Sequence, residues 1–249
     1  MIQIENISMS YGKLVVLSNI NLSIEKGQIY CLLGKNGVGK TTLINLILDL
    51  IKPSEGTIKI LGFKSNMLDK SMKKKLGAVN DSLALIEELT GYEFLYFVGK
   101  IYGLPTDTLK KRIFDIFSYF FEDESDLYKN ISKYSTGMKK KLAFCSSVIH
   151  TPEILILDEP FSGLDPLVAD QMICFINKYQ NKDRVILMSS HDLSYVEKVA
   201  THIAVLDKKK IIFNSTLQDF TENGEKKIDS ALLKFLRPNN SAIEKFDWI

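Results

Sequence analysis

A glycine-rich stretch near the N-terminus constrains this chain more than any other feature. Residues 34–42 read GKNGVGKTT and fit the phosphate-binding pattern G-x-x-x-x-G-K-[ST]. An apolar run over residues 28–33 precedes it and is typical of a buried strand, and the pattern after it, over residues 42–48, is helical. Glycines let the backbone turn tightly, so that N–H groups at the helix N-terminus can surround phosphates. The stretch therefore predicts a bound nucleoside triphosphate. The residues assigned to this binding are Gly34, Asn36, Gly37, Gly39, Lys40, Thr41 and Thr42.

Two carboxylates later in the chain complement this loop. Residues 154–160, ILILDEP, place Asp158 and Glu159 at the end of an apolar strand, and ligands of open α/β sheets bind at that edge. Lys40 is predicted to lie against the β- and γ-phosphates, and Thr41 and Asp158 to hold Mg²⁺. Glu159 is predicted to polarise the water that attacks the γ-phosphate. Without the glycine-rich loop, an ordinary acidic strand end would be the favoured interpretation of these carboxylates.

The order of apolar patterns predicts the fold class. Residues 2–9 and 14–24 alternate apolar and polar side chains and predict antiparallel strands. A helical, aromatic pattern extends from about residue 85 to residue 149, and a strand–helix–strand order follows between residues 154 and 188. That order indicates a parallel sheet. We therefore expect an α/β fold: a P-loop core with a mostly parallel sheet, an N-terminal antiparallel β edge and an inserted helical subdomain.

Composition narrows the class of protein. A chain of 249 residues with 45% apolar side chains suits one large α/β domain, and a net charge of +2 gives no general attraction to nucleic acid. No apolar run approaches the length of about 18–20 residues that spans a bilayer, and the first residues lack the pattern of a signal peptide, so we expect a soluble chain. The three cysteines, Cys31, Cys145 and Cys174, are predicted to be small core residues.

A short segment about 20 residues before the acidic strand carries a family resemblance. In residues 133–143, KYSTGMKKKLA, Ser135 and Gly137 match the L-S-G-G-Q signature of the ATPase subunits of ATP-binding cassette (ABC) transporters, which the chain resembles. The other positions of the segment differ from L-S-G-G-Q, and they resemble the relaxed signature that exporter-type members often carry. The resemblance implies that Ser135 and Gly137 contact the nucleotide held by an opposite subunit. In isolation the segment would also suit a plain serine-capped helix.

Further family elements follow in order. Ser162-Gly163-Leu164-Asp165 resembles the D-loop, which implies that Asp165 helps arrange a dimer interface. Ser189-Ser190-His191-Asp192 resembles the H-loop, which implies that His191 contacts the γ-phosphate. Tyr11 matches the aromatic residue that stacks on adenine. The plainer alternatives are a structural histidine and an exposed turn tyrosine.

One family position is altered in this chain. The alignment of residues 76–79 and 87–91 places Asp81 where the family usually has the glutamine of the Q-loop, which is a Mg²⁺ ligand. Exporter-type members often carry glutamate there, so a carboxylate fits the resemblance. Because Asp81 is one methylene shorter than glutamate, a bridging water is the alternative to direct contact with the metal.

The resemblance implies a function as well as a fold. We expect an ABC ATPase domain over residues 1–215, with a helical subdomain inserted over about 85–150 and a C-terminal extension over 216–249. Two copies, or this chain and a related one, are expected to close around two ATP molecules with Mg²⁺, with hydrolysis driving export through separate transmembrane subunits. The chain would then lie at the cytoplasmic face of the membrane, and no nucleic acid partner is expected.

Two other functions are weighed against export. An importer or lipoprotein-mobilising ATPase would be favoured by glutamine at position 81 and a full signature, and neither is present. A soluble ABC protein that acts on ribosomes or DNA would usually carry two cassettes or long coiled coils. The substrate stays open, with a peptide or antimicrobial compound favoured by the resemblance. The lysine triplets at 73–75, 139–141 and 208–210 are interpreted as solvated faces.

Overall fold

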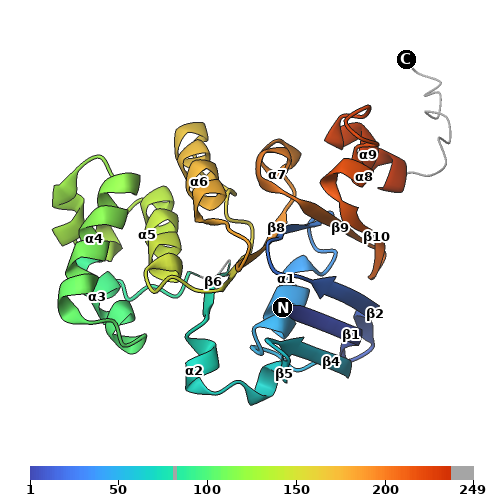
Figure 1. Cartoon of the computed structure of the whole chain (residues 1–249), viewed down its shortest axis with the longest axis horizontal. Helices are drawn as coiled ribbons and strands as arrows, with labels where there is room; N and C mark the ends of the chain where they lie inside the picture. Colours follow the sequence, from blue (N-terminus) through green and yellow to red (C-terminus); the bar gives the residue numbers. More distant parts are fainter. Residues whose placement is uncertain (81–82, 237–249) are drawn as a thin grey trace.

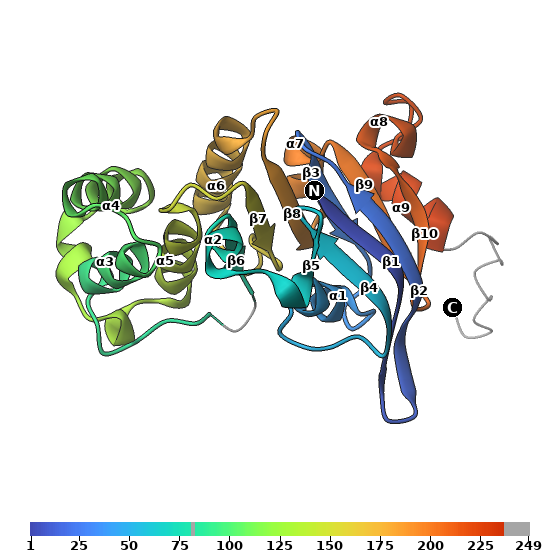
Figure 2. The same ribbon diagram turned by 60° about the horizontal axis from the view of Figure 1, so that its bottom comes forward.

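Two β-sheets enclose one helix in the computed structural model, which describes residues 1–80 and 83–236 (Figures 1 and 2). The helix is α1 (Lys40–Ile47), and it follows directly from the glycine-rich loop. Its apolar side chains Leu43 and Ile47 are buried in a core to which both sheets contribute. The glycine-rich loop therefore leads into the helix that packs between the two sheets.

The smaller sheet is antiparallel and has the strand order β2-β1-β4-β5. Alternating exposed and buried residues along its long strands place one face toward α1 and the other toward solvent. The pair of strands predicted over 2–9 and 14–24 is confirmed. The strands are β1 (Ile2–Tyr11), β2 (Leu14–Ile24), β4 (Glu55–Ile60) and β5 (Phe63–Lys64).

The larger sheet has the order β10-β9-β3-β8-β7-β6, and all its neighbouring pairs except β10–β9 are parallel. Its central strands are buried on both faces, which explains their continuous apolar runs. The mostly parallel sheet predicted from the sequence is confirmed. The strands are β3 (Ile29–Leu33), β6 (Leu76–Val79), β7 (Ile154–Leu157), β8 (Val185–Ser190), β9 (His202–Asp207) and β10 (Lys210–Thr216).

Gly77 of β6 allows this sheet to approach a helix closely. A Cβ atom at this position would lie 2.1 Å from the carbonyl oxygen of Ser147, which belongs to α5 (Thr136–Val148). The close approach joins the helical region to the edge of the larger sheet, as Figure 2 shows.

Most of the remaining helices cover the face of the larger sheet opposite α1, and those of the expected helical subdomain extend away from it (Figure 1). Thr90 begins the first long one with a capping box, in which its hydroxyl accepts from the Glu93 amide and the Glu93 carboxylate accepts from the Thr90 amide. Phe117 and Phe144 are among the buried aromatic residues of the shared core. The helices are α2 (Lys70–Lys73), α3 (Gly91–Ile101), α4 (Thr106–Phe120), α5, α6 (Pro166–Tyr179), α7 (Leu193–Val199), α8 (Leu217–Phe220) and α9 (Ile228–Leu236).

The last helix, α9, packs against the rest of the fold rather than standing apart. Its residues Ile228 and Ala231 are buried in the same core as α6 and α7, and Phe235 lies 4.8 Å from Phe213 between ring centroids. Phe220 of α8 completes this aromatic group. None of the helices in the described ranges is both long enough and apolar enough to span a bilayer.

Candidate functional site

Three parallel strands bring the predicted site residues to one edge of the larger sheet. Strand β3 ends directly before Gly34, β7 ends before Asp158, and β8 ends before His191. Because β3 and β7 both pair in parallel with β8, their carboxyl ends meet at the same edge. The sequence prediction that these motifs share a sheet edge is confirmed.

The glycine-rich loop turns into α1 through a residue that only glycine suits. Gly39 has φ = +115°, a backbone conformation that L-residues rarely adopt. A Cβ atom there would also lie 2.9 Å from the side chain of Leu17. The helix starts at Lys40, two residues earlier than the sequence suggested, so Thr41 and Thr42 lie in its first turn. This turn supplies the free N–H groups and positive helix end that favour phosphate.

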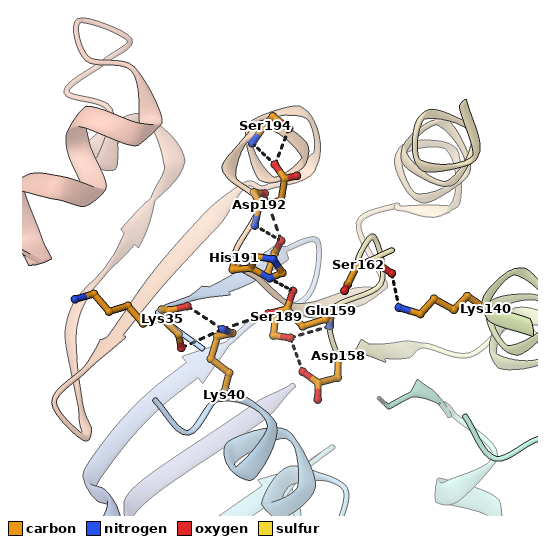
Figure 3. Close-up of polar contacts among 12 residues, drawn as sticks. Lys35, Lys40, Lys140, Asp158, Glu159, Ser162, Ser189, His191, Asp192 and Ser194 are labelled. Atoms are coloured by element: carbon orange, nitrogen blue, oxygen red, sulfur yellow. Dashed lines mark hydrogen bonds and ion pairs between the residues drawn. The ribbon is translucent and has the colours of Figure 1, made fainter. Parts of the chain in front are cut away.

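Lys40, Glu159 and His191 form a chain of contacts across this edge (Figure 3). The buried Lys40 ammonium donates to the carbonyl oxygen of Gly34 at 2.8 Å and lies 3.2 Å from Glu159 Oε1. The other carboxylate oxygen of Glu159, Oε2, lies 2.8 Å from His191 Nδ1. The predicted phosphate-binding lysine, general base and H-loop histidine are therefore in direct contact, and the carboxylate is well placed to accept a proton from a water near Lys40.

Asp158 lies behind Glu159, at the foot of the same site. Its side chain is only 3% exposed, and its Oδ1 accepts a hydrogen bond from the Ser189 hydroxyl. Its Oδ2 is buried and, in the described part of the chain, has no hydrogen-bond partner. A buried carboxylate oxygen without a donor is costly unless a cation neutralises it. The free Asp158 oxygen therefore fits a Mg²⁺ ion, which proteins usually hold through one or two side chains together with nucleotide phosphates. Thr41, in the first turn of α1, is the second ligand that the sequence predicts.

A groove of about 550 Å³ runs from the β1–β2 turn to His191. At one end Tyr11 is 52% exposed, which leaves its ring free to stack on a planar ligand. At the other end are Lys40 and Glu159. The lining residues among those described are Tyr11, Leu14, Val16, Asn36, Gly37, Gly39, Lys40, Thr41, Thr42, Glu159, Ser162 and His191.

The other two histidines have structural surroundings, which separates them from His191. His150 is hydrogen-bonded to the Leu76 carbonyl, and burial lowers the pKa of its imidazole to about 4. His202 is hydrogen-bonded to Gln28, and burial also lowers the pKa of its imidazole. His191 alone faces the groove, with 47% of its side chain exposed.

The predicted signature and D-loop residues do not line this groove. Ser135 caps α5, where its hydroxyl accepts from the Met138 amide, and both Ser135 and Asp165 are exposed. Gly137 follows in the first turn of the same helix. Asp165 caps α6 by accepting from the Val168 amide. One copy of the chain therefore brings together the groove residues and leaves these three facing outward.

Some sequence expectations need correction or lie outside the described residues. Cys174 is exposed, whereas Cys31 and Cys145 are buried as predicted. The lysine triplet 139–141 is not a solvated face: all three side chains are half-buried and reach specific partners, which are the carboxylate of Glu87 and the carbonyls of Ser162 and Phe120. Asp81, the expected Q-loop metal ligand, and Trp248 fall outside the described residues.

Sequence reasoning missed two contributors to the site. Ser189 bonds the carboxylate of Asp158 and the backbone amide of Glu159, and Lys140 contacts the carbonyl of the groove residue Ser162. The signal for Ser189 was available: a buried strand that ends in two serines beside an acidic strand is unusual, because buried hydroxyls need partners. The signal for Lys140 was not, because its contact depends on how α5 packs.

Comparison with known proteins agrees with this geometry. The sequence model of the ABC transporter family matches residues 17–162. The chain is 33% identical to the bacitracin transport ATP-binding protein BcrA of Enterococcus faecalis over 90% of this chain and 72% of that one. It is 30% identical to the lantibiotic transport ATP-binding protein SrtF of Streptococcus pyogenes over 94% and 98% of the two chains. A solved ATP-binding subunit of an ABC transporter superimposes with a TM-score of 0.87 at 26% identity, covering 95% of this chain and 99% of that one.

Proposed function

Because the chain belongs to the ABC transporter family, we propose that it hydrolyses ATP in the groove beside Lys40 and couples this to transport by a separate membrane subunit. The observation that carries the proposal is the contact chain from Lys40 through Glu159 to His191. It places a carboxylate base beside the group that would bind the γ-phosphate. Bound Mg²⁺ would be held by Thr41 and Asp158 and would neutralise charge on the phosphates.

Each groove residue has a distinct role in this proposal. The N–H groups of the loop and the Lys40 ammonium bind the phosphates, and Tyr11 stacks on the adenine ring. Glu159 accepts a proton from the attacking water at Oε2 or Oε1. His191 orients the Glu159 side chain through Nδ1 and presents the rest of its ring to the groove.

The outward-facing residues complete the site in a second copy. Ser135 and Gly137 stand at the N-terminus of α5, a 13-residue helix whose free N–H groups suit an anion. Since they do not line the groove of their own copy, we place them against the nucleotide of the opposite one, with Asp165 at the interface between copies. An isolated chain should then hydrolyse ATP slowly.

Tyr11 provides a test of the base-stacking role. Tyr11→Ala should weaken ATP binding about 5- to 150-fold, because base–aromatic stacking contributes roughly 1–3 kcal/mol. Tyr11→Phe should bind like the wild type, and so should Tyr128→Ala, which removes a comparably exposed tyrosine from the helical region. Calorimetric titration with ATP and with inorganic tripolyphosphate measures the effect. Weakened tripolyphosphate binding in Tyr11→Ala would contradict a role limited to the base.

Export of a peptide-like or antimicrobial compound is the activity we propose for the complete transporter. The relatives are named for bacitracin and lantibiotic transport, and they match this chain over most of its length. The relaxed signature around Ser135 and Gly137 supports the same class. Residues 1–215 would form the ATPase domain, with 85–150 as its helical insertion and 216–249 as an extension, at the cytoplasmic face of the membrane.

The membrane partner is tested by capturing it. Tagged Glu159→Gln protein should hold the closed, ATP-bound assembly, because the nucleotide binds and is not cleaved. A detergent pull-down from native membranes with ATP, followed by mass spectrometry, should recover a polytopic membrane protein in stoichiometric amount. A parallel pull-down of Glu159→Gln with Ser135→Phe should recover less ATP-dependent dimer. Recovery of ribosomes or DNA-processing proteins without a membrane protein would refute the transporter function.

A further inference from the structure

Ser189 joins the two carboxyl residues of the acidic strand through one hydroxyl group (Figure 3). It is fully buried at the end of β8. Its hydroxyl oxygen accepts a hydrogen bond from the Glu159 amide at 2.9 Å, and its hydroxyl proton is donated to Asp158 Oδ1. Because a hydroxyl has one proton, the acceptor at Asp158 fixes its direction and leaves a lone pair for the amide.

The strand register makes this position specific. Leu157 of β7 pairs with Met188 of β8, so the next residue on each strand, Asp158 and Ser189, lie side by side at the sheet edge. Ser190, one residue further, instead accepts from the Asp192 amide at 3.0 Å. Ser189 is thus hydrogen-bonded to the acidic strand end, whereas Ser190 is hydrogen-bonded within the turn that leads into α7.

The contact with Asp158 determines which of its oxygens is free. Oδ1 is occupied by the Ser189 proton, whereas Oδ2 is buried and has no partner among the described residues. A carboxylate anchored through one oxygen cannot rotate without breaking that bond. Ser189 thus holds Asp158 with a defined oxygen available to a cation, which is the role of outer-shell partners at metal sites.

The contact with Glu159 supports an unusual backbone. Glu159 has φ = +48°, in the left-handed region that non-glycine residues seldom adopt. From this conformation its side chain reaches Lys40 and His191. The Ser189 hydroxyl satisfies the Glu159 amide in this conformation, so it helps to direct the catalytic carboxylate toward the groove.

We propose that Ser189 is a positioning residue that aligns the metal-binding carboxylate of Asp158 with the catalytic carboxylate of Glu159. The inference rests on the proposed ATP hydrolysis and adds a residue that acts through two others. Loss of the hydroxyl should impair metal binding and turnover together, while nucleotide binding without metal, which depends on the glycine-rich loop and Tyr11, should persist.

The test uses the purified full chain and separates metal-dependent from metal-free binding. Ser189→Ala should lower both kcat and the affinity for Mn²⁺ in the presence of a non-hydrolysable ATP analogue, each about 10- to 100-fold. Steady-state ATPase assays and Mn²⁺ electron paramagnetic resonance measure these quantities. Binding of a fluorescent ATP analogue in EDTA should be unchanged. Ser147→Ala is the matched control, because Ser147 is also buried and, among the described residues, its hydroxyl bonds the Phe144 carbonyl of its own helix rather than the acidic strand.

A second pair of variants isolates the hydroxyl from packing. Ser189→Thr keeps the hydroxyl. Ser189→Val has nearly the same shape as the Thr variant but carries a methyl group in place of that hydroxyl. The Thr variant should therefore retain more Mn²⁺ affinity and turnover than the Val variant. Equal values for the two, or wild-type values in Ser189→Ala, would overturn the inference. Loss of metal-free binding in Ser189→Ala would also overturn it, because a general disruption would explain the result. Failure of the wild-type chain to bind the ATP analogue would instead refute the proposed function.

Discussion

Glu159→Gln should reduce ATP hydrolysis by about 10²- to 10⁴-fold while leaving ATP binding intact. The amide keeps the size of the side chain but cannot accept the proton of the attacking water. The groups assigned to phosphate binding, which are the loop N–H groups and Lys40, are unchanged. Lys40 also keeps its hydrogen bond to the Gly34 carbonyl at 2.8 Å, so its position does not depend on Glu159 alone. Phosphate release and equilibrium ATP binding, measured on the same preparation, check the two halves of this expectation.

A matched control is available at the other end of the same strand. Glu153 lies just before β7, whereas Glu159 lies just after it, and Glu153 forms an exposed ion pair with Lys75 at 2.8 Å. Glu153→Gln should therefore hydrolyse ATP at the wild-type rate, since exposed ion pairs contribute little to stability. Undiminished turnover in Glu159→Gln would remove its assignment as the base and leave the nucleotide site itself in place.

Lys40→Ala should weaken ATP binding about 10- to 150-fold, because hydrogen bonds to charged groups contribute roughly 1.5–3 kcal/mol. The Lys40 side chain is 5% exposed and its ammonium is already held in the groove by the Gly34 carbonyl, so little ordering is needed when phosphate binds. Calorimetric titration with ATP measures the loss.

The neighbouring lysine provides the control for this variant. Lys35 belongs to the same loop, and its exposed side chain points away from Lys40 (Figure 3). Only its carbonyl takes part, at 3.4 Å from the Lys40 ammonium. Lys35→Ala should retain ATP affinity, and an equal loss in both variants would indicate a nonspecific effect of charge. Unchanged affinity in Lys40→Ala would contradict the phosphate-binding role.

The parts of the fold that were predictable depend on local patterns. The predicted strand over residues 14–24 coincides with β2, and the apolar run at 154–157 coincides with β7. The glycine-rich loop and the acidic strand end have fixed positions relative to their own elements, so the sequence could assign both to one edge of a parallel sheet. Lys40, Glu159 and His191 meet because three adjacent strands end there, but their direct contacts were not predicted.

The features that were missed have two causes: a local pattern that was not applied, and packing between distant segments. Cys174 was expected in the core from its residue type, but helical periodicity places it off the buried face of α6 that carries Met172, Ile173 and Ile176. Lys141 reaches the Phe120 carbonyl only because α4 ends beside α5. A contact such as that of Lys141 has no signature in a short stretch of sequence.

The position of α1 has a consequence for cooperativity. The larger sheet separates two apolar cores, and α1 belongs with β1 and β4 to only one of them, whereas α3 and α4 belong to the other. A ligand at the N-terminus of α1 therefore adds its binding energy to one side of the sheet. Native-state amide exchange would measure this effect. Bound nucleotide would slow exchange in the unit that contains α1 and β1, whereas exchange in α3 and α4 would stay unchanged. Nucleotide binding would thus create a gradient of rigidity across a single domain.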